Sequence, residues 1–375
     1  MRGKIKILNY FSARINLTIF LILIVSTSLR IFICFFSNLP WFNTDSYTYF
    51  NMADGILYGK PISYFPNGYP LFIALLKLIF SDALVPTILI IFNIIFQILS
   101  QYLFFKLLIK LNLNKELALI TLFFVAIYPN QINYTRQILT EPISLFLLIL
   151  SLLMYVSNKP FLSGITGFLA AQFRPTLIFL FPLILIHEII SKNTKKSFLL
   201  GLGVILCLFF FKILEYFNLI LPPDNLKFNL IVATYSDSFN INWELARSKL
   251  SIIKNPLSVY INHLITNPLD FLEKRIISLW SLWGPFSVTH RGILEKILIG
   301  IRFPLFMFSI ALFLLRKNLL SKNILIITYL PILVITFIHT MFFSQQRFTF
   351  VVEPFIIMHT VLYLYSFKGN FLNEN

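Results

Sequence analysis

Charged residues are scarce in this sequence. Asp, Glu, Lys and Arg make up 12% of its 375 residues, whereas hydrophobic residues make up 58%. A soluble globular domain is typically about one quarter charged, so this composition excludes an ordinary soluble protein. The sequence is typical of a polytopic membrane protein, in which the bilayer determines how the chain is arranged.

Cysteine and acidic residues are also few. The two cysteines, Cys34 and Cys207, both lie inside apolar runs, which excludes a disulfide framework and a cysteine-based metal cluster. Asp and Glu number 15 against 31 Lys and Arg, and the formal net charge is +16. In so apolar a chain, this excess of positive charge indicates cytoplasmic loops and contact with anionic membrane lipids, and no nucleic-acid partner is expected.

Long apolar runs supply the predicted membrane spans, because about 20 apolar residues cross the hydrocarbon core as a helix. The apolar stretch 69–80 is shorter and is expected to be interfacial or re-entrant. The basic start of the chain, with no small-residue cleavage site after the first run, indicates an uncleaved anchor. Ten spans are expected, at about residues 15–36, 84–108, 116–128, 142–155, 160–171, 175–190, 198–221, 293–315, 323–343 and 350–367.

The distribution of charge predicts the topology. Lys and Arg predominate in the segments that ten spans would leave on the side of the two termini, whereas most acidic residues lie in the other segments. Because short loops rich in Lys and Arg stay in the cytoplasm, both termini are expected there and the acidic loops outside. The expected location is the bacterial cytoplasmic (inner) membrane.

Three regions follow from this topology. They are an N-terminal transmembrane catalytic module at 1–221 with a first outer loop at 37–83, an outer-face helical segment at 222–292, and C-terminal transmembrane helices at 293–375. The middle region is expected to be helical because Asn255-Pro256 and Asn267-Pro268 put proline where helices begin. Apolar residues recur at helical spacing after both prolines, which is typical of amphipathic helices on a membrane surface.

The first outer loop carries a candidate catalytic residue. Asp45 lies in the segment 37–70 among several Trp and Tyr residues, which favour the headgroup level of a bilayer. Its carboxylate is a candidate general base. Asp is also a common N-cap residue, and the residues alone leave the catalytic and the capping interpretations open.

Three arginines lie close to expected helix starts on the outer side, namely Arg136, Arg174 and Arg347. An arginine beside the free N–H groups of a helix N-terminus suits phosphate binding. Glu141 adds a second carboxylate on the same side. Simpler interpretations are interfacial arginines that extend to the headgroups and, for Glu141, a helix cap. The five histidines have no metal-ligand spacing.

The order of these motifs resembles one family. The motifs are Asp45-Ser46-Tyr47-Thr48-Tyr49, Tyr69-Pro70, Tyr128-Pro129 with Glu141 after it, Phe173-Arg174-Pro175-Thr176, Asn267-Pro268 with Phe271, Arg275 and Trp280, and Gln346-Arg347-Phe348. Together they resemble the GT-C superfamily of polyprenyl-phosphate-sugar-dependent membrane glycosyltransferases. The closest branch is that of the protein O-mannosyltransferases and the lipid A aminoarabinose transferase. The resemblance covers nearly the whole chain and depends on the order of short motifs.

This resemblance implies an all-α, GT-C-like membrane fold with about ten transmembrane helices and outer-face interfacial helices. It also implies a site, in which Asp45 matches the essential first-loop acid and Glu141 matches the acid that begins a later span. These two are the expected catalytic residues. The expected substrate-binding residues are Arg136, Arg174, Arg347, Tyr49 and Tyr69.

Two positions depart from the family pattern. Phe348 stands where relatives often have Tyr, and Ser46 stands where many have a second acid. The second departure puts a metal-binding pair of acids at Asp45 in doubt. No metal ligand or cofactor is predicted, and dependence on a divalent metal is left open.

The expected reaction is an inverting transfer of a sugar from a polyprenyl-phosphate-linked donor to a glycan, lipid or protein acceptor. Asp45 would take the acceptor proton, and the arginines would stabilise the leaving phosphate. A glycan polymerase or ligase is an alternative, because the segment 222–291 gathers several basic residues as such a protein would. A secondary transporter or flippase is another, although no repeat is found and only the break at Arg174-Pro175 favours it. A non-catalytic scaffold would tolerate Asp45→Asn.

Overall fold

The computed structural model describes residues 2–37, 40–284 and 300–367. Within these ranges the chain forms helices and no β-strand, which confirms the predicted all-α fold class. The elements are α1 (Arg2–Ile31), η1 (Phe32–Phe36), α2 (Thr44–Leu57), α3 (Gly68–Ile79), α4 (Val85–Lys110), α5 (Lys115–Ile127), α6 (Pro129–Thr135), α7 (Glu141–Val156), α8 (Pro160–Phe173), η2 (Pro175–Phe179), α9 (Leu180–Ile190), α10 (Thr194–Tyr216), α11 (Asn225–Tyr235), α12 (Trp243–Ile252), α13 (Pro256–Thr266), α14 (Pro268–Trp283), α16 (Arg302–Arg316), η3 (Lys317–Leu319), α17 (Lys322–Ile324), η4 (Leu325–Tyr329), α18 (Leu330–Met341), η5 (Gln346–Val352) and α19 (Glu353–Tyr365).

Within the described residues, five helical segments are long and apolar enough to cross a membrane, so the chain is a multi-pass membrane protein. A sixth span would result if α5 and α6, which are bent by 50°, count as one. The five segments are Arg14–Phe36, Val85–Lys110, Thr194–Tyr216, Lys322–Met341 and Arg347–Tyr365.

The described residues thus contain fewer full-length spans than the ten predicted. Apolar helices do occupy the other predicted positions, but they are short, such as Glu141–Val156 and Pro175–Ile190. At 1.5 Å per residue, a helix of 16 residues is about 24 Å long, less than the ~30 Å of a hydrocarbon core. The predicted span 293–315 begins outside the described residues, and its described part is α16. The short helix expected at 69–80 is present as α3.

The helices of the bundle pack closely where side chains are small. Helix α8 contacts α7 and α10, and α7 also contacts α4. A Cβ atom added at Gly164 of α8 would lie 2.2 Å from the carbonyl oxygen of Leu200, and one added at Gly203 of α10 would lie 2.3 Å from that of Phe161. The backbones of α8 and α10 therefore approach each other at two glycines, as small residues allow in membrane helix pairs.

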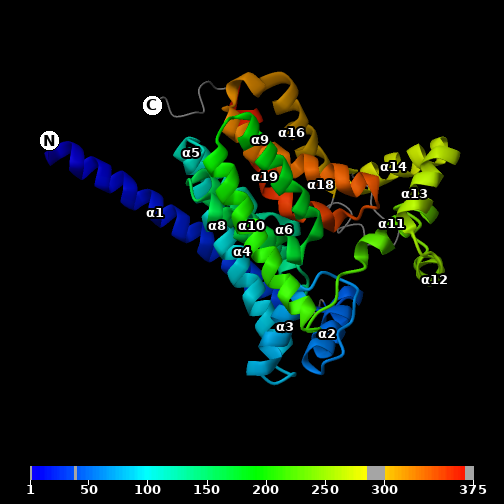
Figure 1. The fold of residues 1–375 in the computed structure, drawn as a ribbon. Coiled ribbons are helices and arrows are strands. Elements are labelled where there is room, and N and C mark those ends of the chain that lie inside the picture. The colour runs from blue at the N-terminus through cyan, green and yellow to red at the C-terminus, as the bar shows by residue number, and fades with distance from the viewer. Residues whose placement is uncertain (1, 38–39, 285–299, 368–375) are drawn as a thin grey trace.

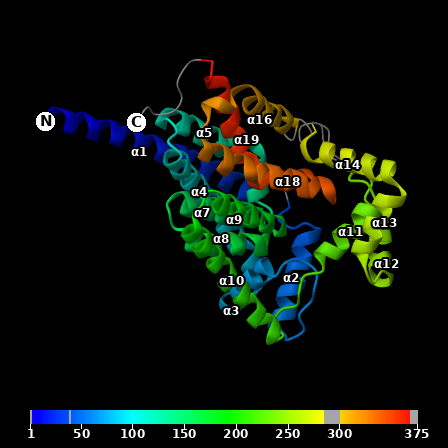
Figure 2. The ribbon, with the colours of Figure 1, turned by 45° about the horizontal axis from the view of Figure 1, so that its top comes forward.

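The segment after α10 forms a separate group of helices. Figures 1 and 2 show α11 to α14 together at one end of the molecule, away from the start of α1 and near α2. Helices α13 and α14 begin at Pro256 and Pro268, and the Asn255 side chain accepts a hydrogen bond from the amide of Ser258. The predicted helical character of 222–292 is confirmed as far as residue 284, and its boundary at 292 lies outside the described residues.

Candidate functional site

Asp45 lies in the first turn of α2, but it does not cap this helix. The cap is Asn43, whose side chain accepts a hydrogen bond from the amide of Ser46 (3.0 Å). The Ser46 hydroxyl in turn accepts one from the amide of Asn43 (3.1 Å), which completes a capping box. The capping interpretation of Asp45 is therefore wrong, and its carboxylate is available for other contacts.

Two polar segments that are far apart in the sequence are joined beside Asp45. The stretch 40–46 runs against the stretch 136–138, which leads into Glu141. Four hydrogen bonds connect them. They run from Arg136 Nη1 to the Pro40 carbonyl (2.5 Å), from the Ile138 amide to the Trp41 carbonyl (2.9 Å), from the Ser46 hydroxyl to the Ile138 carbonyl (2.8 Å), and from Asn43 Nδ2 to Gln137 Oε1 (3.4 Å). Arg136 is thus buried and bound to backbone, and it does not extend to the headgroups.

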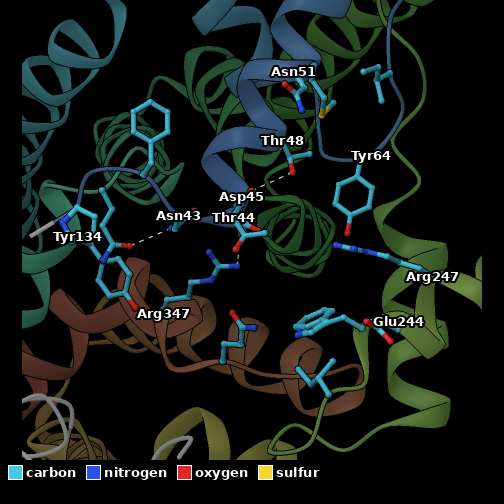
Figure 3. Close-up of a pocket in the computed structure, with 18 of the residues that line it drawn as sticks. Asn43, Thr44, Asp45, Thr48, Asn51, Tyr64, Tyr134, Glu244, Arg247 and Arg347 are labelled. Atoms are coloured by element: carbon cyan, nitrogen blue, oxygen red, sulfur yellow. Dashed lines mark hydrogen bonds and ion pairs between the residues drawn. The ribbon is translucent and has the colours of Figure 1, made fainter. Parts of the chain in front are cut away.

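An ion pair joins Asp45 to Arg347, which lies near the start of η5. The Asp45 Oδ2 and Arg347 Nη2 atoms are 2.6 Å apart, and each side chain is a little over one fifth exposed. Figure 3 shows Arg347 reaching toward the N-terminal turn of α2. The two residues are about 300 positions apart in the chain, so this contact is purely tertiary.

A second ion pair lies deeper. Glu141, the first residue of α7, and Arg174, directly after α8, have their Oε1 and Nη1 atoms 3.4 Å apart. Their side chains are only 3% and 7% exposed. The cap position of α7 is Thr140, and no side-chain hydrogen bond caps this helix. Glu141 is therefore a buried partner of an arginine and not a helix cap, and Arg174 does not extend to the headgroups.

Phe348 brings the two arginines together. The Arg174 and Arg347 guanidinium carbons lie 5.3 Å and 5.5 Å from the centre of its ring. The His339 ring also stacks on Phe348, with centroids 4.2 Å apart. An aromatic ring attracts cations within about 6 Å, so Phe348 helps to hold two positive charges side by side. Phenylalanine at this position is therefore compatible with the predicted site.

The two ion pairs line a small chamber of about 170 Å³, and a large chamber of about 1340 Å³ lies beside it. Glu141, Arg174 and Tyr49 line the small chamber, and Arg136 lines the large one. Asp45 and Arg347 line both. The open ion pair therefore stands where the two chambers meet.

Several buried polar atoms around the small chamber have no protein partner. A buried donor or acceptor left unsatisfied costs about 1–3 kcal/mol, and such a group is normally bound to water, an ion or a ligand. Buried unpartnered atoms also occur elsewhere in the described residues, but here six of them belong to residues that line one chamber, which suits the binding of a polar molecule. These atoms are Oε2 of Glu141, Nε and Nη2 of Arg174, Oγ1 of Thr176, Nε2 of His339 and Nε of Arg347.

The two predicted tyrosines have different positions. Tyr49 is buried in the wall of the small chamber. Burial raises the pKa of Tyr49 above its usual range, and the charges of Asp45 and Glu141 act in the same direction, so its hydroxyl stays protonated at neutral pH. Tyr69 lies behind it in an edge-to-face contact, with centroids 5.0 Å apart, and does not line either chamber.

Most of the lining residues were not among the predicted site residues, and four of these have side chains suited to binding a substrate. His339 and Thr176 line the small chamber, Arg247 lines the large one, and Trp243 lines both. Thr176 is the last residue of the Phe173-Arg174-Pro175-Thr176 motif, so the sequence contained a signal for its place at the site. Trp243 and Arg247 are four residues apart on α12, and this helical spacing puts both on one face, but nothing in the sequence directs that face toward α2.

The donor groups at this site do not suit a divalent metal ion. Asp45 and Glu141 are each paired with an arginine, whose positive charge would oppose a bound cation. Among the residues that the structure describes, no group of three or more His, Cys, Asp or Glu side chains is arranged to hold a metal.

Two solved structures have a similar fold. The apo form of the oligosaccharyltransferase of Archaeoglobus fulgidus superposes with a TM-score of 0.56 at 14% identity, covering 93% of this chain and 50% of that chain. The fold is oligosaccharyltransferase-like. A structure of the archaeal oligosaccharyltransferase AglB from the same organism, in complex with an inhibitory peptide and a dolichol-phosphate, gives 0.52 at 13% identity, covering 95% and 52%.

This chain spans about half the length of both structures. No protein-family profile matches it, and no curated protein matches it by sequence. At this level of identity the likeness is one of fold alone, and it does not distinguish among the families that share the fold.

Proposed function

We propose that this protein is a membrane glycosyltransferase of the GT-C type, which transfers a sugar from a polyprenyl-phosphate-linked donor. The observation that carries the proposal is the small chamber, where two arginines and unpartnered polar atoms face Asp45 and Glu141. The branch related to protein O-mannosyltransferases and the lipid A aminoarabinose transferase remains part of the proposal. So does the location, with the site on the outer face of a bacterial cytoplasmic membrane and both termini in the cytoplasm.

The donor phosphate would bind in the small chamber. Arginine presents a planar fork that matches phosphate oxygens, and Arg174 has its Nε and Nη2 atoms free of protein partners. His339 and Thr176 add further polar atoms on the same wall. Glu141 holds Arg174 in place through their buried ion pair. The dolichol-phosphate bound to the similar archaeal enzyme supports a lipid phosphate as the donor class.

The acceptor would react beside Asp45. A hydroxyl or amine of the acceptor transfers its proton to the Asp45 carboxylate as the oxygen or nitrogen attacks the anomeric carbon of the donor sugar. The bond from this carbon to the phosphate oxygen breaks, and its electron pair leaves with the phosphate. Arg174 and Arg347 stabilise the added negative charge. Attack on the face opposite the phosphate inverts the anomeric configuration.

Arg347 would couple donor binding to activation of the base. Its Nη2 atom now binds Asp45, while its Nε atom has no partner. A phosphate that draws Arg347 toward the small chamber weakens its contact with Asp45. The carboxylate then becomes available to an acceptor proton only when a donor is present.

The deciding experiment is sugar transfer in membranes that carry wild type or Asp45→Asn at matched expression. A panel of radiolabelled undecaprenyl-phosphate sugars is offered together with extracted envelope glycans, lipids and proteins as acceptors. We expect transfer by wild type and a loss of about 10²–10⁴-fold in Asp45→Asn, the usual contribution of a general base. Equal transfer by both would remove Asp45 from the chemistry. If wild type transfers no sugar from any donor, the transferase proposal fails.

A further inference from the structure

The large chamber, unlike the small one, is lined by a row of uncharged polar side chains on α2. Thr44, Thr48 and Asn51 follow one another on a single face of α2, at the spacing of successive helical turns, and Asp45 is next to the first of them. Figure 3 shows these side chains along α2, with Tyr64 and Arg247 on another side of the chamber. Hydroxyls and amides both donate and accept hydrogen bonds, which matches the alternating needs of sugar hydroxyls.

Two aromatic rings form another part of the wall. Trp243, which is 38% exposed, stacks on the buried Phe228 with an interplanar angle of 8° and centroids 6.0 Å apart. Tyr64 packs on the same Phe228, at 5.8 Å. Phe228 therefore supports both rings from behind and holds them in place. A rigid aromatic face suits the apolar C–H face of a pyranose, and Trp and Tyr add polar edges.

The size of this chamber also has a consequence. Its volume of about 1340 Å³ exceeds the roughly 300–1,000 Å³ of typical sites for a single small ligand. One monosaccharide would leave most of the space to water. An occupant of several sugar units would instead use the whole polar face of α2 and reach the aromatic wall.

From this combination we infer that the large chamber binds the acceptor and that the acceptor is a hydroxyl-rich oligosaccharide. The inference rests on the transferase function proposed above, and it names the acceptor class. Trp243 and Tyr64 stack on the sugar rings, and the α2 face binds their hydroxyls. The reacting hydroxyl lies at the end of this face, where Asp45 stands between the two chambers.

Other acceptor classes suit the chamber less well. A lipid acceptor needs a continuous apolar wall, whereas polar residues such as Thr44, Thr48 and Asn51 interrupt the lining here. One structure of similar fold is in complex with an inhibitory peptide, and peptides are bound in several ways. A peptide acceptor, as a second class, is therefore an outcome that the test must be able to report.

The test is binding to an array of defined oligosaccharides of two to six units, printed beside eight-residue peptides rich in Ser, Thr and Asn. The full-length protein is purified in detergent and applied as wild type, Trp243→Ala or Trp243→Phe. We expect wild type to bind oligosaccharides and Trp243→Ala to lose at least about tenfold in affinity, as for an aromatic anchor residue. Trp243→Phe keeps a flat ring and is expected to retain most of the binding.

Trp280→Ala is the matched control, because this tryptophan is also exposed but lies on α14 and lines neither chamber. It should bind as wild type does. If Trp243→Ala does not elute as a folded protein, Asn51→Ala, on the α2 side of the chamber, replaces it, and a loss of oligosaccharide binding is again expected. Oligosaccharide binding that these substitutions leave unchanged, capture of the peptides alone, or no binding to any probe would each overturn the inference.

Two outcomes separate this inference from the proposed function. Sugar transfer to a peptide, sensitive to Asp45→Asn, would overturn the oligosaccharide acceptor and leave the transferase standing. Trp243-dependent oligosaccharide binding without transfer from any polyprenyl-phosphate sugar would leave a glycan-binding chamber and remove the transferase.

Discussion

The two ion pairs of this site contain the same chemical groups in different surroundings. Asp45 and Arg347 are 2.6 Å apart and partly open to solvent, at the junction of the two chambers. Glu141 and Arg174 are 3.4 Å apart and almost completely buried, and three of their polar atoms have no protein partner. The open pair is close and leaves one buried atom, Nε of Arg347, without a protein partner, whereas the buried pair is longer and leaves three.

This difference indicates different roles. A fully exposed ion pair is worth about 0–1 kcal/mol, and a pair that solvent partly reaches can exchange partners at less cost than a buried one. A buried charge without its partner is strongly unfavourable, so Glu141 and Arg174 hold each other in place. The buried pair thus suits a fixed framework for an anion, and the open pair suits a part that changes partners during a reaction.

The largest expected effect comes from breaking the buried pair. Glu141→Ala leaves the Arg174 charge buried and uncompensated, and should lower the free energy of unfolding by about 3–5 kcal/mol. Asp45→Ala breaks the open pair and should cost no more than about 1 kcal/mol. Denaturant titration of the two purified variants in the same detergent measures both changes. Equal losses would show that the two pairs do not differ in the way described.

A smaller effect is expected when the planar guanidinium group of Arg347 is replaced by an ammonium group. Arg347→Lys keeps the positive charge but loses a bidentate geometry toward phosphate. The KM for the polyprenyl-phosphate donor should rise by about tenfold, which corresponds to about 1.4 kcal/mol, with little change in stability. Donor titrations in the transfer assay provide the measurement.

Arg247→Lys is the control for this change, since Arg247 lines only the large chamber. Its donor KM should stay near the wild-type value. If both lysine variants raise the donor KM equally, Arg347 has no special relation to the phosphate.

The smallest expected effect comes from removing the cap of α2, the helix that positions Asp45 of the open pair. Asn43→Ala removes the side-chain cap of α2, and caps of this kind contribute about 1 kcal/mol. Because the cap lies two residues before Asp45, transfer activity should also decrease. Asn114→Ala removes an equivalent cap from α5, where Asn114 accepts a hydrogen bond from the Glu116 amide. It should cost a similar stability and leave activity unchanged, and an equal loss of activity in both variants would contradict a local role of Asn43.

Much of the fold was predictable because it depends on local patterns. Apolar runs and Asn-Pro steps gave the helical positions, and α13 and α14 begin at the predicted prolines. The lengths of the spans were less predictable, since short apolar helices such as α7 differ little in composition from full-length spans. The stretch around Asp45 was expected as a loop, although Asn43 and Ser46 have the spacing of a capping box, and the structure has α2 there.

The site was predictable as a set of residues but not as pairs. Asp45, Glu141, Arg174 and Arg347 were expected on one side of the membrane, and the structure brings all four around one chamber. Which arginine binds which acid depends on tertiary packing between segments far apart in the chain. The contribution of Trp243 depends on how α12 folds back toward α2, and no local pattern reports that.

The hydrogen bonds between 40–46 and 136–138 have a consequence for the local unfolding of this protein. Segments bonded in this way form one cooperative unit, whose amides become exposed together. The first segment carries Asp45 and the second leads to Glu141. In a hydrogen-exchange experiment, the amides of Ser46 and Ile138 should therefore have similar protection factors. Local unfolding would disassemble the open and the buried ion pair in a single step, and refolding would restore both at once.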